Sequence, residues 1–210
     1  MVKKIDYSIY LVAGSENARE GKLLSSIDEA IQGGCSMVQL REKDASSRDF
    51  YYTAVEVKKI TDKYDIPLII NDRADIAVAV DAAGLHVGQS DLPAKIARKI
   101  IGENKILGIS ASNLDEALEA EKAGAGYLGV GAMFQTDTKT DAVIVTIEDL
   151  IAIRERIKLP IVVIGGINES NLDMFNYSGI DGIAVVSAIL SKPDIKKATM
   201  ELRGIFDGLK

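Results

Sequence analysis

Residues 68–93 read LIINDRADIAVAVDAAGLHVGQSDLP, and this stretch indicates the fold. Its apolar runs at residues 68–70 and 85–87 are too short for helices and are typical of buried parallel strands. Residues 74–80 between them are rich in alanine and valine, with an acidic residue in the first turn, which predicts a short crossover helix. The stretch therefore predicts a β-α-β unit with two parallel strands.

Each of these two strands is followed by an aspartate, Asp72 or Asp91. Because the strands are parallel, we expect both carboxylates at the same edge of the sheet, about one or two strand spacings apart. A single aspartate before a helix is more often an N-cap, and this alternative stays open for each residue. Two carboxylates beside cationic residues, without His or Cys support, favour a Mg²⁺ site.

The same pattern recurs along the whole chain. We expect strands at residues 9–12, 37–40, 68–70, 85–87, 106–109, 127–130, 161–164 and 183–186. Helices are expected near residues 25–33, 48–63, 74–80, 93–101, 113–123, 146–157, 169–177 and 194–208. Ser47, Pro93 and Asn113 stand at three of the helix starts. Eight alternating units in about 200 residues predict an α/β fold of the (β/α)8 (TIM) barrel type, with an open doubly wound sheet as the alternative.

Composition and charge limit the classes of protein. The 210 residues are 47% hydrophobic and contain no linker-like segment, so we expect one domain, residues 1–210. The start of the chain fits a first strand better than a secretion signal, and no apolar stretch is long enough to span a membrane. A single cysteine and a single histidine argue against disulfides and a Cys/His zinc site, which favours the cytoplasm. The net charge of −6 argues against nucleic acid or an anionic membrane as partner.

Cationic residues follow several of the predicted strands. Arg41, Lys43, Arg73 and Lys139 would surround the mouth of the barrel, where they could bind a diphosphate. The alternative for each of them is an ordinary solvated surface residue. The segment at residues 131–142 is long and polar for a loop between strand and helix, which indicates a lid, although a loop without function would look the same.

Two glycines follow the seventh predicted strand, Gly165 and Gly166. Loops after strands seven and eight of such barrels often bind phosphate, although a Gly-Gly pair also occurs in many tight turns. His86 lies inside a predicted strand, so we expect it to be structural rather than catalytic, and Cys35 is expected to be a small core residue. The sequence shows no Ser/His/Asp or Cys/His arrangement for a covalent nucleophile.

Five motifs stand in order along the chain: VQLREK at 38–43, INDR at 70–73, HVGQSDLP at 86–93, GVG at 129–131 with FQTDTK at 134–139, and IGGI at 164–167. In these motifs the chain resembles the thiamine-phosphate synthase family over nearly its whole length. That family is a (β/α)8 barrel that joins a hydroxymethylpyrimidine diphosphate to a thiazole phosphate with Mg²⁺. The chain departs from the usual family pattern at Gln135, where proline is common, and at Gly126, where an acidic residue is common.

The resemblance implies a role for each matching residue. Asp72 and Asp91 would bind Mg²⁺, and Arg41, Lys43 and Lys139 would stabilise the departing pyrophosphate. The pyrimidine diphosphate would be held by Gln39, Leu40, Arg41, Glu42, Lys43, Asn71, Ser110 and Lys139. The thiazole phosphate would be held by Thr136, Thr138, Gly166, Val186 and Ser187, with Asp137 also among the substrate-binding residues.

The reaction implied by the resemblance is dissociative. The aminopyrimidine delocalises positive charge at its methylene carbon, and the thiazole nitrogen attacks with its own lone pair, so no general base is needed. The alternatives are a thiazole tautomerase paralogue, which needs proton transfer, and a non-catalytic phosphate-binding barrel. The expected partners are the two small-molecule substrates, and the sequence leaves the oligomeric state open, a homo-oligomer included.

Overall fold

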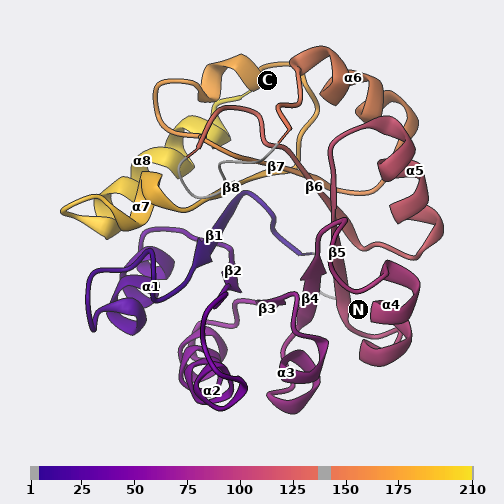
Figure 1. Ribbon diagram of the computed structural model, residues 1–210. Coiled ribbons are helices and arrows are strands. Elements are labelled where there is room, and N and C mark those ends of the chain that lie inside the picture. The colour runs from indigo at the N-terminus through magenta and orange to yellow at the C-terminus, as the bar shows by residue number, and fades with distance from the viewer. Residues whose placement is uncertain (1–4, 137–142, 210) are drawn as a thin grey trace.

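Parallel strands form a closed barrel in the computed structural model, which describes residues 5–136 and 143–209 (Figure 1). The strands are β1 (Ile9–Ala13), β2 (Met37–Leu40), β3 (Leu68–Asn71), β4 (Gly84–Val87), β5 (Ile106–Ala111), β6 (Tyr127–Val130), β7 (Ile161–Ile164) and β8 (Gly182–Val185). Each strand pairs with the next in the sequence, and β8 pairs with β1 through Ile183 and Ile9. The predicted (β/α)8 barrel is confirmed, and the open sheet is excluded.

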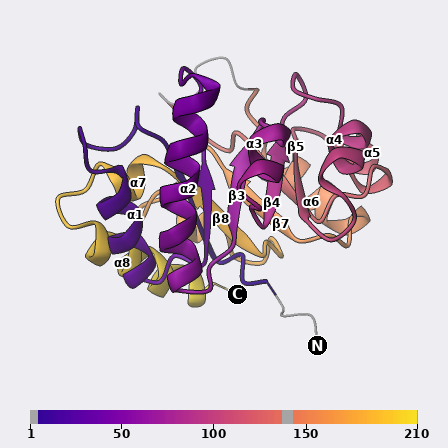
Figure 2. The same ribbon diagram turned by 90° about the horizontal axis from the view of Figure 1, so that it is seen from below.

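Helices surround the barrel. They are α1 (Leu23–Gln32), α2 (Ser47–Lys63), α3 (Ala74–Ala79), α4 (Ala94–Ile101), α5 (Leu114–Lys122), α6 (Ile147–Arg156), α7 (Ser187–Leu190) and α8 (Ile195–Asp207), with the 3-10 helix η1 (Leu172–Phe175). The C-terminal α8 packs against α1 and so closes the ring of helices, as the side view shows (Figure 2). None of the described helices is long and apolar enough to cross a membrane.

The seventh predicted helix, near residues 169–177, is wrong. The segment forms only the four-residue η1. Upstream of it, the side-chain oxygen of Asn168 accepts hydrogen bonds from the N–H and hydroxyl of Ser170, and that of Asn171 accepts from the N–H of Asn168. These local side-chain bonds compete with helical bonds and hold the chain in turns.

The three helix starts marked by Ser47, Pro93 and Asn113 were predicted within a residue. Ser46, not Ser47, caps α2, because its hydroxyl accepts from the N–H of Asp49 at 3.1 Å. Asn113 caps α5 as expected, accepting from the N–H of Glu116 at 2.9 Å. Pro93 immediately precedes α4.

Alternating side chains of the strands separate two apolar layers. Ile9 and Leu11 of β1 belong to the large cluster between strands and helices, whereas Tyr10 and Val12 belong to the smaller cluster inside the barrel. The interior cluster consists of Tyr7, Tyr10, Val12, Met37, Ile69, Tyr127, Val162 and Ala184. The inward-facing Gln39 lies level with Val12 and Ile69 of this cluster in the strand register.

Candidate active site

Asp72 and Asp91 lie at the carboxyl ends of neighbouring strands. Asp72 follows β3 in a left-handed backbone conformation (φ 59°), and its carboxylate accepts a hydrogen bond from the Lys43 ammonium. The Asp91 carboxylate accepts from the N–H of Gly88 at 2.8 Å. Neither aspartate is the N-cap of the helix that follows it, since Arg73 and Pro93 occupy those positions. The N-cap alternative is therefore not what the structure contains.

The two carboxylates influence each other's protonation. Burial raises the pKa of Asp72, the Lys43 ammonium offsets part of this rise, and the adjacent Asp91 raises the pKa further. Burial also acts to raise the pKa of Asp91, but hydrogen bonds from Asp72 and the Gly88 N–H, with the charge of Lys43, bring it below its usual value. The pKa values of the two adjacent carboxylates are thus shifted in opposite directions, and a bound cation would offset the repulsion between their charged forms.

The donor set fits Mg²⁺ better than a transition metal. Within residues 5–136 and 143–209, no group of three or more His, Cys, Asp or Glu side chains could hold a metal ion. Two carboxylates alone match a cation that completes its shell with water and substrate phosphate, as Mg²⁺ usually does.

The cationic side chains predicted at the mouth of the barrel have different hydrogen-bond partners. Arg41 forms an ion pair with Glu16 at 2.5 Å, which holds the guanidinium at the end of β2. Arg73 instead donates to Asp75 and to the Ser47 hydroxyl, at 2.6 and 2.9 Å, so it joins the starts of α3 and α2. Lys139, with Asp137 and Thr138, lies outside the described residues.

Residues 39–42 and Asn71 differ in how their side chains are used. The Glu42 carboxylate accepts from the N–H and hydroxyl of Ser15, so it anchors the loop after β1. The Leu40 side chain is buried in the cluster between strands and helices. Gln39 points into the barrel, where its amide nitrogen donates to the Tyr10 hydroxyl at 2.8 Å. Asn71 ends β3 beside Asp72 and is half-buried.

A hydrogen-bonded chain of side chains crosses the barrel interior. From Tyr10 it continues to the Tyr127 hydroxyl at 2.8 Å, to His86 Nδ1 at 2.9 Å, and from His86 Nε2 to the Ser110 hydroxyl at 3.0 Å. Burial lowers the pKa of His86 to about 4, so the ring is neutral near pH 7. His86 is therefore hydrogen-bonded at both ring nitrogens, and its structural rather than catalytic role stays a prediction. The sequence analysis missed Tyr10 and Tyr127, although both stand at inward strand positions.

The loops after β6 and β7 lie against each other. The N–H of Phe134 donates to the Gly165 carbonyl at 3.1 Å, and the Gly166 carbonyl accepts from the side chains of Asn168 and Asn171. Both glycines have positive φ, 101° and 65°, which favours glycine. Thr136 is the last described residue before the gap, and Val186 and Ser187 stand at the junction of β8 and α7.

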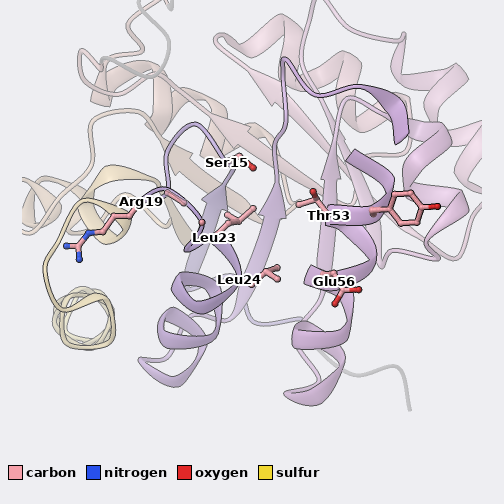
Figure 3. A pocket seen from close by; sticks show the side chains of 9 residues that line it. Ser15, Arg19, Leu23, Leu24, Thr53 and Glu56 are labelled. Carbon is pink, nitrogen blue, oxygen red and sulfur yellow. The ribbon is translucent and has the colours of Figure 1, made fainter. Parts of the chain in front are cut away.

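A cavity of about 360 Å³ lies between α1 and α2, and its lining residue Ser15 is hydrogen-bonded to Glu42 (Figure 3). The leucines Leu23 and Leu24 of α1 border one side, and Thr53 and Glu56 of α2 border the other. Its full lining is Ser15, Ala18, Arg19, Gly21, Leu23, Leu24, Tyr52, Thr53 and Glu56. None of the residues predicted to bind substrate or metal is among them, so we do not place the chemistry there.

Comparisons with known proteins identify the family. The sequence model described as thiamine monophosphate synthase matches residues 9–189. The thiamine-phosphate synthase of Clostridium beijerinckii is 59% identical over 98% of this chain and 99% of its own length. That of Methanobrevibacter smithii is 51% identical over 96% of both proteins. The thiamine phosphate pyrophosphorylase structure from Pyrococcus furiosus superposes with a TM-score of 0.89 at 39% identity, covering 97% of both chains.

These matches span the barrel and every motif on which the resemblance rested. The chain therefore belongs to the thiamine monophosphate synthase family.

Proposed function

We propose that this enzyme uses Mg²⁺ to join a hydroxymethylpyrimidine diphosphate to a thiazole phosphate, which gives thiamine phosphate and pyrophosphate. The observation that carries the proposal is the juxtaposition of Asp72 and Asp91 at adjacent strand ends with the Lys43 ammonium bound to one of them. Family membership supplies the reaction, and this cluster supplies a place where a diphosphate and its metal ion can be held together.

Asp72 and Asp91 would hold the Mg²⁺ ion. When bound there, the ion would offset negative charge on the diphosphate of the substrate. The mutual effect of the carboxylates on their pKa values supports this assignment, because a cation relieves the repulsion between them.

Arg41, Lys43 and Lys139 would stabilise the pyrophosphate as it leaves. The Arg41 guanidinium is preorganised by its ion pair with Glu16, and the Lys43 ammonium is preorganised by Asp72. Donors fixed before the reaction cost little reorganisation when charge develops on the leaving oxygen. Gln39, Leu40, Glu42, Asn71 and Ser110 would complete the site for the pyrimidine diphosphate.

The bond changes need no base from the protein. The bond between the methylene carbon and the diphosphate oxygen breaks, and its electron pair leaves with pyrophosphate. The lone pair of the thiazole nitrogen then forms the new C–N bond. The task of the protein is to hold that nitrogen behind the carbon and to exclude water. A neutral His86 with both ring nitrogens already bonded agrees with a reaction that uses no histidine base.

The thiazole phosphate would bind over the loops that follow β6, β7 and β8. Positive φ at Gly166 and the lack of a side chain let this turn pass close to the backbone of Gln135, and backbone N–H groups of such a turn can face a phosphate. Thr136, Asp137, Thr138, Val186 and Ser187 complete this part of the proposal. Action in the cytoplasm and self-association stay predictions from the sequence.

The experiment compares Lys43→Gln with Lys58→Gln in an assay of thiamine phosphate formation. Lys58 lies on α2 and pairs with Asp62, so its loss serves as a charge-matched control. We expect Lys43→Gln to lower kcat by roughly 100-fold and the control to behave as wild type. Full turnover by Lys43→Gln, or product formation without one of the substrates, would contradict the proposal.

A further inference from the structure

The hydrogen-bonded chain inside the barrel has a direction. Each tyrosine hydroxyl carries one proton, so a hydroxyl that accepts from one neighbour has its own proton left for the next. Gln39 donates an amide N–H to Tyr10, at 2.8 Å. The order from Tyr10 to Tyr127 to His86 Nδ1 gives both hydroxyl protons an acceptor, at 2.8 and 2.9 Å, whereas the reverse order leaves the Tyr10 proton without either of these acceptors.

The far end of the chain is fixed in the same way. An imidazole that accepts at Nδ1 carries its one ring proton on Nε2, and that proton is donated to the Ser110 hydroxyl at 3.0 Å. Ser110 then keeps its own proton for a substrate atom. At the other end, Gln39 uses its nitrogen on Tyr10, which leaves its amide oxygen as an acceptor. One end of the chain thus offers an acceptor, and the other offers a donor.

Two glycines leave room for the hydrogen bond between Tyr127 and His86. In the strand register, Gly108 of β5 lies between His86 of β4 and Tyr127 of β6. A Cβ at Gly108 would stand 2.3 Å from the Tyr127 hydroxyl and 2.5 Å from His86 Nδ1. A Cβ at Gly129 would stand 2.9 Å from the His86 ring. Neither glycine has positive φ, so close approach rather than backbone conformation accounts for both.

We propose that Tyr10, Tyr127 and His86 are positioning residues that set the hydrogen-bonding polarity of Gln39 and Ser110, and so select an aminopyrimidine over its oxo analogue. This inference rests on the proposed function, in which Gln39 and Ser110 hold the pyrimidine. An amino group donates to the Gln39 oxygen, and a ring nitrogen accepts from the Ser110 hydroxyl. In the oxo analogue a carbonyl replaces the amino group and accepts rather than donates, so it meets the wrong group at the Gln39 oxygen.

The Gln39 end of the chain can change polarity only if the whole chain reverses, because its amide N–H is used on Tyr10. To accept the oxo ring, Gln39 must turn its amide, both hydroxyl protons must reverse, and the His86 proton must move to Nδ1. Loss of the Tyr127 hydroxyl divides the chain into two halves that reorient independently. Discrimination between the two rings then decreases even though every group that touches the ring is still present.

Two measurements test this, and the first does not depend on catalysis. The chain has one histidine, so histidine-selective ¹⁵N labelling of untagged protein reports only the His86 ring nitrogens. We expect the proton on Nε2 and a hydrogen-bonded Nδ1 in the wild type. In Tyr127→Phe we expect the Nδ1 resonance to move to the value of an unbonded nitrogen. A wild-type proton on Nδ1 would overturn the direction of the chain.

The second measurement is the binding of the aminopyrimidine monophosphate and its 4-oxo analogue without thiazole phosphate, so that the reactivity of the two rings does not enter. We expect Tyr127→Phe to lower the amino-to-oxo affinity ratio by roughly ten-fold. Tyr7→Phe is the matched control, because the Tyr7 ring packs 5.4 Å from Tyr127 and is not a link of the chain. Tyr10→Phe breaks the chain one link earlier and replaces Tyr127→Phe if the latter does not fold.

The outcomes separate the inference from the proposed function. An unchanged affinity ratio in Tyr127→Phe, or an equal loss in Tyr7→Phe, would overturn the selection of the ring by the chain. Failure of the wild type to bind the aminopyrimidine would overturn the proposed function and with it the selectivity. The His86 proton position would still report whether the chain has the proposed direction.

Discussion

The Lys43 ammonium donates a hydrogen bond to the carboxylate of Asp72, which connects the segment after β2 to the end of β3 at the mouth of the barrel. The contact places a fixed positive charge next to a carboxylate whose pKa is raised, first by burial and then by its neighbour Asp91. At this place the Lys43 ammonium would attract a diphosphate, and the two carboxylates would attract its cation.

Asp72→Asn should abolish most of the turnover without unfolding the protein. Asparagine tolerates the left-handed conformation that Asp72 adopts at φ 59°, so the backbone should not change. The loss of one anionic ligand should lower kcat at limiting Mg²⁺ by at least roughly 100-fold. Steady-state kinetics over a Mg²⁺ titration, together with thermal unfolding, measure both effects.

Asp81→Asn is the control for that variant. Asp81 also has positive φ, 52°, but it pairs with Lys105 on the exposed surface, at 2.6 Å. It should retain wild-type kinetics at every Mg²⁺ concentration. Equal losses in the two variants would show that the effect of Asp72 is not specific to the site.

Acid should destabilise the fold through His86. Above pH 6.5 the ring is neutral in both the folded and unfolded states, whereas burial lowers the folded pKa to about 4. Between these values the unfolded chain binds a proton that the folded ring does not, so the free energy of unfolding falls as the pH falls. The loss should amount to roughly 3 kcal/mol and should level off below the folded pKa.

Urea unfolding of the wild type and His86→Asn between pH 7 and pH 4 checks this. The carboxylates titrate in both proteins, so the difference between the two curves isolates the histidine. The wild type should lose more stability over this interval than the variant. Parallel curves would mean that His86 is protonated in the folded barrel.

Gly108→Ala should destabilise the barrel interior. The added Cβ would stand 2.2 Å from Cζ of Tyr127, so the ring or the strand must move. We expect a loss of about 1–3 kcal/mol in the free energy of unfolding, measured with urea. Gly204→Ala in α8 meets nothing within 4 Å and should instead stabilise the protein by about 1 kcal/mol. Wild-type stability in Gly108→Ala would show that the interior has spare room.

The periodicity of the sequence was sufficient to predict the strands and most helices. Short apolar runs separated by amphipathic segments are compatible with few other folds. Parallel strands bring Asp72 and Asp91 to the same edge of the sheet, independently of how their side chains are oriented. The correct placement of these two residues therefore depended on topology alone.

Three features depended on contacts that sequence spacing does not contain. η1 is short because local side chains of Asn168 and Asn171 bind the backbone. Arg73 follows β3 at the carboxyl edge as expected, but its guanidinium donates to Asp75 and Ser47, partners that the sequence analysis did not predict. The hydrogen bond between Tyr127 and His86 needs a residue without a side chain between them, and Gly108 stands there in the strand register. That register is known only from the folded sheet.

The central claim is a Mg²⁺-dependent displacement of pyrophosphate at Asp72 and Asp91. The most direct measurement is pyrophosphate release on mixing the pyrimidine diphosphate and the thiazole phosphate, with Mg²⁺ or with EDTA, for the wild type and Asp72→Asn. We predict release with thiamine phosphate formation only for the wild type with Mg²⁺ and both substrates. Undiminished release in EDTA, or from Asp72→Asn at limiting Mg²⁺, would contradict the account.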